Sequence, residues 1–102
     1  MKHFSFTSAP GVICGQENNP DLFIRKVIFE KGYSEQEFHN HPNSYEFYIV
    51  LDGILTFANE TNEISAHKGS IIYFEEAEHH KITNVTEATT MLLIKRVGSV
   101  KS

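Results

Sequence analysis

The stretch HNHPNSYEFYIVLDG, residues 39–53, carries the pattern that best predicts how this chain folds. Side chains on an extended strand alternate between its two faces, so His39 and His41 project to the same side. Their imidazoles are then close enough to share one ion. We interpret the pair as half of a metal-binding site.

Glu46 and His80 complete the predicted site. Glu46 lies an odd number of positions beyond His41, so on an unbroken strand it would face the other way, but Pro42-Asn43-Ser44 interrupts the strand and can restore the direction of the carboxylate. His80 lies far downstream and must arrive from a separate strand. It can reach the other ligands only if the sheet folds back on itself as a sandwich or a barrel.

The other histidines are weaker candidates for metal ligands. His3 lies in the N-terminal segment and His67 precedes the Lys68-Gly69 turn, and neither has a partner at ligand spacing. We interpret both as structural or solvated. His79 competes with His80, because neighbouring strand residues face opposite sides and only one can point inward.

The remainder of the chain predicts an all-β fold, since no window has a convincing helical stripe. β-Branched and aromatic residues concentrate in predicted strands at 22–30, 46–51, 54–59, 63–67, 70–74, 80–84 and 89–97. Asp52-Gly53 between two apolar runs predicts a two-residue type I′ hairpin, because both central positions of that turn need positive φ. We find no repeat or linker. One domain over residues 1–102 is predicted, with residues 1–10 as a mobile or strand-exchanging arm.

The predicted strand at 46–51 is apolar on both faces. Glu46, Tyr48 and Val50 share one face, and the other face has Phe47, Ile49 and Leu51. A half-exposed strand would carry polar residues on its outer face. This pattern predicts a homodimer that covers the second face, with loops of the same chain as the alternative.

Composition limits the classes of function. The chain has 102 residues, 40% hydrophobic residues and a net charge of −4, with no Lys/Arg cluster longer than a pair. These values argue against a nucleic-acid groove or an anionic membrane surface. No apolar run reaches membrane-spanning length, residues 1–10 lack the run of a signal peptide, and the lone Cys14 is interpreted as a buried core residue. Cytoplasmic residence is the default expectation.

With these residues in view, the sequence resembles the cupin superfamily, small antiparallel β-barrels of the double-stranded β-helix or jelly-roll type, also called RmlC-like. Two motifs jointly bind a metal there. Gly32, His39, His41, Glu46 and Gly53 match the first motif with one extra residue before His39. Gly69, His80 and Asn84 keep the spacing of the second, which selects His80 over His79 as the inward ligand.

One departure from the second motif concerns a turn. Glu75-Glu76-Ala77 stands where the family pattern has Pro-X-Gly, so the turn lacks a preset φ and a flexible glycine. The change removes no ligand. A metal-binding cupin is therefore the main interpretation, and a metal-free relative with vestigial residues is the alternative.

Three imidazoles and one carboxylate suit a divalent transition metal such as Mn, Fe, Co, Ni, Cu or Zn better than Ca or Mg. Four protein ligands leave positions open for water or a bound molecule. Tyr48 shares a face with Glu46 and is the candidate acid–base hydroxyl, with core packing as the alternative. Arg25 is a weaker candidate for gripping a carboxylate inside the barrel. Glu75, Glu76 and Glu78 form either a solvated turn or an acidic mouth that favours neutral or cationic molecules.

Two functions from different classes remain open. The first is a small metal-dependent cupin that binds or acts on a small organic molecule, such as a sugar or carboxylic-acid derivative, with isomerase, lyase or dioxygenase chemistry undecided. The second is a non-enzymatic sensor, because His39-Asn40-His41 followed by Tyr45-Glu46-Phe47-Tyr48 also looks similar to the effector-binding arm of arabinose-regulator-type transcription factors.

Overall fold

The computed structural model describes residues 1–5, 7–15, 21–41 and 43–97, and this part of the chain contains strands and no helix. The strands are β1 (Gly11–Cys14), β2 (Leu22–Phe29), β3 (Ser44–Asn59), β4 (Glu63–His67), β5 (Ile71–Phe74) and β6 (His80–Val97). The all-β prediction is confirmed. No helix of the described residues is long and apolar enough to cross a membrane.

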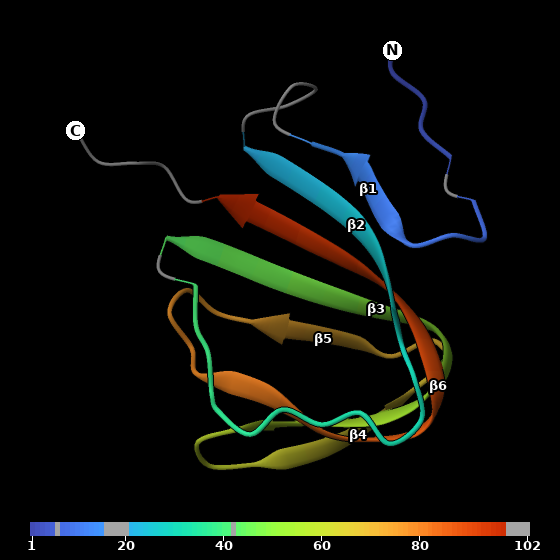
Figure 1. The fold of residues 1–102 in the computed structure, drawn as a ribbon. Helices are drawn as coiled ribbons and strands as arrows, with labels where there is room; N and C mark the ends of the chain where they lie inside the picture. Colours follow the sequence, from blue (N-terminus) through green and yellow to red (C-terminus); the bar gives the residue numbers. More distant parts are fainter. Residues whose placement is uncertain (6, 16–20, 42, 98–102) are drawn as a thin grey trace.

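Two long strands, β3 and β6, organise the sheet. All pairings are antiparallel and follow the order β1-β2-β6-β3-β4, with β5 also paired to β3. β3 and β6 pair with each other from Ser44 opposite Val97 to Asn59 opposite His80. Figure 1 shows both strands curving, so that the sheet rolls into a barrel with β1 and β2 towards one end and β4 at the other.

The core lies on the inner face of this rolled sheet. As the alternation predicts, Tyr48 and Val50 are buried, whereas Phe47, which precedes Tyr48, is 38% exposed. Burial of one large apolar side chain contributes about 1.5–3 kcal/mol, so the interior cluster is the main source of stability. Its members are Tyr48, Val50, Leu55, Phe57, Ala66, Ile72, Phe74, Ile82, Val85 and Met91.

The predicted hairpin at Asp52-Gly53 is wrong, because β3 continues through these residues. The register between β3 and β6 shifts between Val50 and Asp52 and again between Asp52 and Ile54, which is the irregularity of a β-bulge. Gly53 has a φ of 101°, and a Cβ there would lie 2.5 Å from Oγ1 of Thr89. Gly53 therefore allows β3 to bend close against β6. The predicted strands at 46–51 and 54–59 form one continuous strand.

The N-terminal part of the chain adds β1, which the sequence pattern does not predict because the strand has only four residues. β1 pairs with β2, and Cys14 at its end is buried, as expected. Before β1, the carbonyl oxygen of Thr7 accepts a hydrogen bond of 2.6 Å from Nζ of Lys26. This contact joins the segment before β1 to β2.

Candidate metal centre

A pair of backbone hydrogen bonds brings the two halves of the candidate site together. The amide of His39 donates to the carbonyl of His80 over 3.0 Å, and the amide of His80 donates to the carbonyl of His39 over 2.9 Å. His39 lies in the connection between β2 and β3, which Figure 1 shows passing across the barrel end near β4. The two histidines thus form an isolated antiparallel bridge, and their side chains emerge on the same side.

The three predicted histidine ligands meet at one place. One ring nitrogen from each of His39, His41 and His80 lies within 4.8 Å of the others. Ring centroids are 4.5 Å apart for His39 and His80, 5.7 Å for His39 and His41, and 6.0 Å for His41 and His80. The structure therefore brings together side chains that start far apart in the sequence.

Glu46 adds a carboxylate to this cluster from β3. Its Oε1 lies 3.2 Å from Nε2 of His80 and 3.5 Å from Nε2 of His41. Glu46 is 3% exposed. The direction of its side chain follows the turn in which the amide of Ser44 donates to the carbonyl of His41 and Asn43 adopts a left-handed φ of 65°. Pro42, which the sequence analysis places in this turn, lies outside the described residues.

The environment of His80 selects its tautomer. Nδ1 lies 2.9 Å from the carbonyl oxygen of Glu78, which can only accept, so Nδ1 carries the proton and donates. In the neutral ring Nε2 is then a bare acceptor, and this buried atom has no hydrogen-bond partner although Oε1 of Glu46 is nearby. Two acceptors facing each other in a buried place need a proton or a cation between them. A metal ion fits this donor set.

The pKa values of the cluster reflect burial and mutual charge. Burial alone would raise the pKa of Glu46, but interaction with His80 and the charges of His41 and Lys95 lower it overall. Burial alone would lower the pKa of His80, yet interaction with Glu46 and the carbonyl of Glu78 raise it. Burial lowers the pKa of His41. His41 is therefore readily available as a neutral ligand, whereas His80 must give up a proton to bind a metal.

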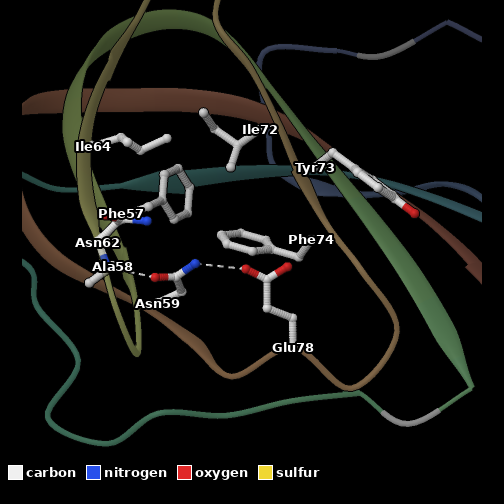
Figure 2. A pocket seen from close by; sticks show the side chains of 9 residues that line it. All are labelled: Phe57, Ala58, Asn59, Asn62, Ile64, Ile72, Tyr73, Phe74 and Glu78. Atoms are coloured by element: carbon white, nitrogen blue, oxygen red, sulfur yellow. Dashed lines mark hydrogen bonds between the residues drawn. The ribbon is translucent and has the colours of Figure 1, made fainter.

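Aromatic packing fixes the ring of His80. The ring of Phe74 lies flat against it, with centroids 4.0 Å apart and an angle of 11° between planes. Phe74 also lines a cavity of about 150 Å³ between β3, β4 and β5, shown in Figure 2, to which none of the candidate ligands contributes. In that cavity Nδ2 of Asn59 donates to the carboxylate of Glu78 over 3.0 Å. Glu78 thus supports His80 through its backbone and the β3 end through its side chain.

The remaining histidines lie outside the cluster. His79 faces away from His80 and pairs with Glu60 at 2.9 Å. His67 is exposed, with Nδ1 3.1 Å from the carbonyl oxygen of Lys68, and His3 is also exposed. Asn84 of the second motif is exposed and donates to Oγ1 of Thr86, so it is not part of the site.

Sequence reasoning missed two charged residues beside the cluster. Oε1 of Glu35 lies 3.2 Å from Nε2 of His39 and accepts a hydrogen bond from the amide of Ile82. Nζ of Lys95 lies 3.4 Å from Nδ1 of His41, and β6 places Lys95 directly opposite Glu46. The only signal for Lys95 in the sequence is its position two residues from the apolar Leu93 on a predicted strand.

Tyr48 lies two residues from Glu46 on β3 and lines a larger cavity. It is buried, and burial together with the charges of Glu46 and Glu35 raises the pKa of its hydroxyl well above the ordinary value. Tyr48 also lines a cavity of about 360 Å³ with Arg25, Val27, Phe29, Leu93, Pro10 and Ile28. Cross-strand pairing of Arg25 with Leu93, and of Leu93 with Tyr48, puts Arg25 on the inner face of the sheet.

The turn that departs from the second motif adopts a strained conformation. Ala77 has a φ of 62°, at the position where the family pattern has glycine. The amide of Glu78 donates to the carbonyl of Glu75, and the carboxylate of Glu78 accepts from the amide of Glu75. The carboxylate of Glu78 is therefore engaged within this turn and with Asn59, and the turn still delivers His80 to the cluster.

Comparison with known proteins identifies the family of this fold. The model of the family described as "Cupin domain" matches residues 25–95. No curated protein matches the chain.

Solved structures of similar fold include a cupin protein from Bacteroides fragilis, with 16% identity, a TM-score of 0.75 and coverage of 100% of this chain and 92% of that one. An RmlC-like cupin family protein with a double-stranded β-helix fold, from Methanocaldococcus jannaschii, has 18% identity, a TM-score of 0.75 and coverage of 95% and 91%. A predicted oxalate decarboxylase from Thermotoga maritima has 18% identity, a TM-score of 0.76 and coverage of 84% and 76%. At these identities the likeness concerns the fold alone.

Proposed function

The chain belongs to the cupin domain family, and from that premise we propose that it binds one divalent transition-metal ion through His39, His41, Glu46 and His80 and uses it to bind or act on a small organic molecule. The observation that carries the proposal is the buried Nε2 of His80, which has no hydrogen-bond partner and faces Oε1 of Glu46. A cation between these two acceptors would satisfy both.

Each ligand is held by a different part of the fold. The backbone bridge between His39 and His80 sets their spacing, and Phe74 and the carbonyl of Glu78 fix the ring of His80. Glu46 is buried on β3, so its carboxylate has little freedom to turn away. Such support of metal ligands by neighbouring groups favours a defined geometry over a loose surface site.

A metal held by these ligands would act as a Lewis acid towards a carbonyl or hydroxyl group, with isomerase, lyase and dioxygenase reactions as the candidate classes. Tyr48 stays protonated through the physiological pH range because its pKa is raised. Its hydroxyl would therefore donate a hydrogen bond to a bound molecule rather than accept a proton from it. The apolar walls of the adjoining cavity would exclude water around that molecule.

The metal proposal is tested by elemental analysis of the purified protein and of two variants. His39→Ala and His80→Ala should each lose stoichiometric metal, and His79→Ala is the matched control because its side chain points away and pairs with Glu60. Circular dichroism of each variant would check that the barrel persists. Stoichiometric metal in both His39→Ala and His80→Ala would refute the proposed site.

Catalysis and sensing are distinguished by turnover. Candidate sugars and oxo-acids would be incubated with the metal-loaded protein, and product formation would be followed by mass spectrometry. Product that disappears in His80→Ala supports an enzyme. Tight binding without product supports the effector-binding alternative.

We also propose that the chain forms a homodimer through the outer face of β3 and β5. Phe47 is 38% exposed, Tyr73 44% and Ile71 62%, and the ring of Tyr73 stacks on those of Phe47 and Tyr45. No second layer of the described chain covers these aromatic rings. Such a contiguous apolar face is typical of a self-complementary subunit interface.

A further inference from the structure

One cation, Lys95, lies beside the candidate metal centre, and a second, Arg25, lies on the same face of the sheet, in the lining of the cavity next to Tyr48. Lys95 is half-buried, and its Nζ lies 3.4 Å from Nδ1 of His41. Arg25 lines the cavity of about 360 Å³. Among the described residues, no carboxylate lies at ion-pair distance from either side chain.

The strand register places both cations on the inner face of the barrel. Lys95 is opposite Glu46, and two residues earlier on β6 Leu93 is opposite both Tyr48 and Arg25. Lys95 and Arg25 are thus diagonal neighbours on adjacent strands, about 7–8 Å apart between Cα atoms. Their long side chains can reach opposite ends of one small molecule.

The charges around the site do not balance. With a divalent ion bound, the metal, Lys95 and Arg25 would together carry four positive charges, while Glu46 and Glu35 supply two negative ones. Of the two remaining positive charges, the one on Lys95 is half-buried, where uncompensated charge is costly, and the one on Arg25 is exposed at the cavity. A dianion would neutralise them.

The lining of the cavity distinguishes between kinds of anion. Apart from Arg25 and the hydroxyl of Tyr48, the side chains that line the cavity are apolar. Phosphate sites typically offer several donors to one group of oxygens, which these walls do not. Lys95 is not part of this lining, but it lies two residues along β6 from Leu93, which is. A carboxylate at each end of a short apolar spacer would therefore match Arg25 in the cavity and Lys95 next to it.

We propose that Lys95 and Arg25 bind the two carboxylates of a small organic diacid beside the metal centre. This inference rests on the proposed function, because the metal contributes half of the positive charge. A diacid ligand is the opposite of what we would expect if the acidic residues at 75, 76 and 78 formed a mouth that favours neutral or cationic molecules. Within this acidic turn, the carboxylate of Glu78 accepts hydrogen bonds from Asn59 and from the amide of Glu75, which reduces its repulsion of a bound anion.

The probe is succinate, compared with its uncharged counterpart succinamide and with inorganic phosphate. Elemental analysis first confirms one equivalent of metal in protein loaded with Zn²⁺, and binding is then measured by isothermal titration calorimetry. We expect succinate to bind at least about tenfold more tightly than succinamide or phosphate. Lys95→Met and Arg25→Gln should each weaken succinate binding by about tenfold, as expected for loss of one charged hydrogen-bonding partner, and should retain the metal.

The matched control is Lys68→Met, which removes an exposed lysine from the turn between β4 and β5 and should leave succinate binding unchanged. Arg25 is exposed at the cavity, so Arg25→Gln keeps the inference testable if Lys95→Met does not fold. Metal-loaded protein that binds succinate no better than succinamide overturns the inference. So does tighter binding of phosphate, or unchanged affinity in both variants. If the wild-type protein takes up no metal, the proposed function is refuted instead. The metal analysis therefore distinguishes failure of the proposed function from failure of the diacid inference.

Discussion

The carboxylate of Glu35 contacts the imidazole of His39, with Oε1 3.2 Å from Nε2. The same oxygen accepts a hydrogen bond of 2.8 Å from the amide of Ile82, and the amide of Glu35 donates to the carbonyl of Ile82. The hydroxyl of Tyr33 donates to the other carboxylate oxygen. Glu35 is thus tied to β6 and in turn restrains His39, which has no strand of its own to hold it.

Glu35→Gln should weaken metal binding by about tenfold or more, because a carboxylate that orients a ligating histidine and raises its basicity is typically responsible for that much affinity. The loss is expected whether Glu35 only orients His39 or also contacts the metal. Competition with a metal-binding dye would measure the affinity. Glu37→Gln, an exposed neighbour, should match the wild type, and equal affinity in both variants would contradict this role for Glu35.

The stability of the metal-free protein should fall as the pH rises above 6.5. His80 has a pKa raised above its ordinary value of 6.5, so its protonated form stabilises the fold fully below 6.5, and that stabilisation is lost as the pH passes through the raised value. His41 has a lowered pKa and is mostly neutral in the folded chain at these pH values, so it opposes the decline only near 6.5, where the unfolded chain still carries part of its charge. Thermal unfolding in EDTA between pH 6.5 and 8.5 would measure the decline.

The same titration predicts the pH dependence of metal stabilisation. Because His80 must lose its proton to bind a metal, the rise in melting temperature on adding Zn²⁺ should grow over the same pH range. Glu46→Gln removes the charge that raises the pKa of His80 and should flatten the metal-free decline, whereas His79→Ala should retain it. A decline that persists undiminished in Glu46→Gln would show that another group is responsible.

Gly53→Ala should destabilise the barrel by about 3 kcal/mol or more. A Cβ at this position would lie 2.5 Å from Oγ1 of Thr89 and against the backbone carbonyl of Ala88, in addition to the strain of a φ of 101°. Gly32→Ala is the matched control, because Gly32 has a similar φ of 90° but nothing within 4 Å of the added atom. Chemical denaturation should show a loss of only about 1–2 kcal/mol there. Equal losses would mean that β6 does not constrain the bulge.

The proposed dimer should dissociate when charge is placed on its apolar face. Phe47→Lys should give a monomer in sedimentation equilibrium, because a lysine in the centre of an apolar interface would have to be desolvated without a partner. Ile64→Lys changes a residue that is also exposed, at 46%, but lies on β4 and lines the cavity of Figure 2. That variant should remain dimeric. A monomeric wild type would rule out the interface.

Local periodicity made much of the fold predictable. The alternation of Tyr48, Val50 and Phe47 gave the inner and outer faces of β3, and the bounds of β4 agree with the predicted 63–67. The hairpin predicted at Asp52-Gly53 is wrong, because a glycine with positive φ is compatible with a hairpin turn and with a β-bulge. Only contact with Thr89, a residue on the distant β6, shows which one forms.

The proposed ligands could be predicted from their spacing in the sequence, whereas their charged neighbours could not. His39 and His41 are close in sequence, and His80 follows from motif spacing, so their meeting could be predicted. Glu35 and Lys95 reach the cluster only through pairing with β6 and β3. No spacing rule within one segment encodes that register, which depends on the bulges of both long strands.

Ala77→Gly should stabilise the protein by about 0.5–1 kcal/mol. Ala77 has a φ of 62°, a conformation that costs a residue with a Cβ about 1–2 kcal/mol, and the greater flexibility of glycine in the unfolded chain offsets part of the gain. Urea denaturation would measure the difference. Asn43→Gly is the matched control, since Asn43 has a φ of 65° but asparagine tolerates this conformation well, and it should show little or no gain. If Ala77→Gly were no more stable than the wild type, the turn before His80 would have to be relaxed with alanine in place, and the departure from the family motif would carry no energetic cost.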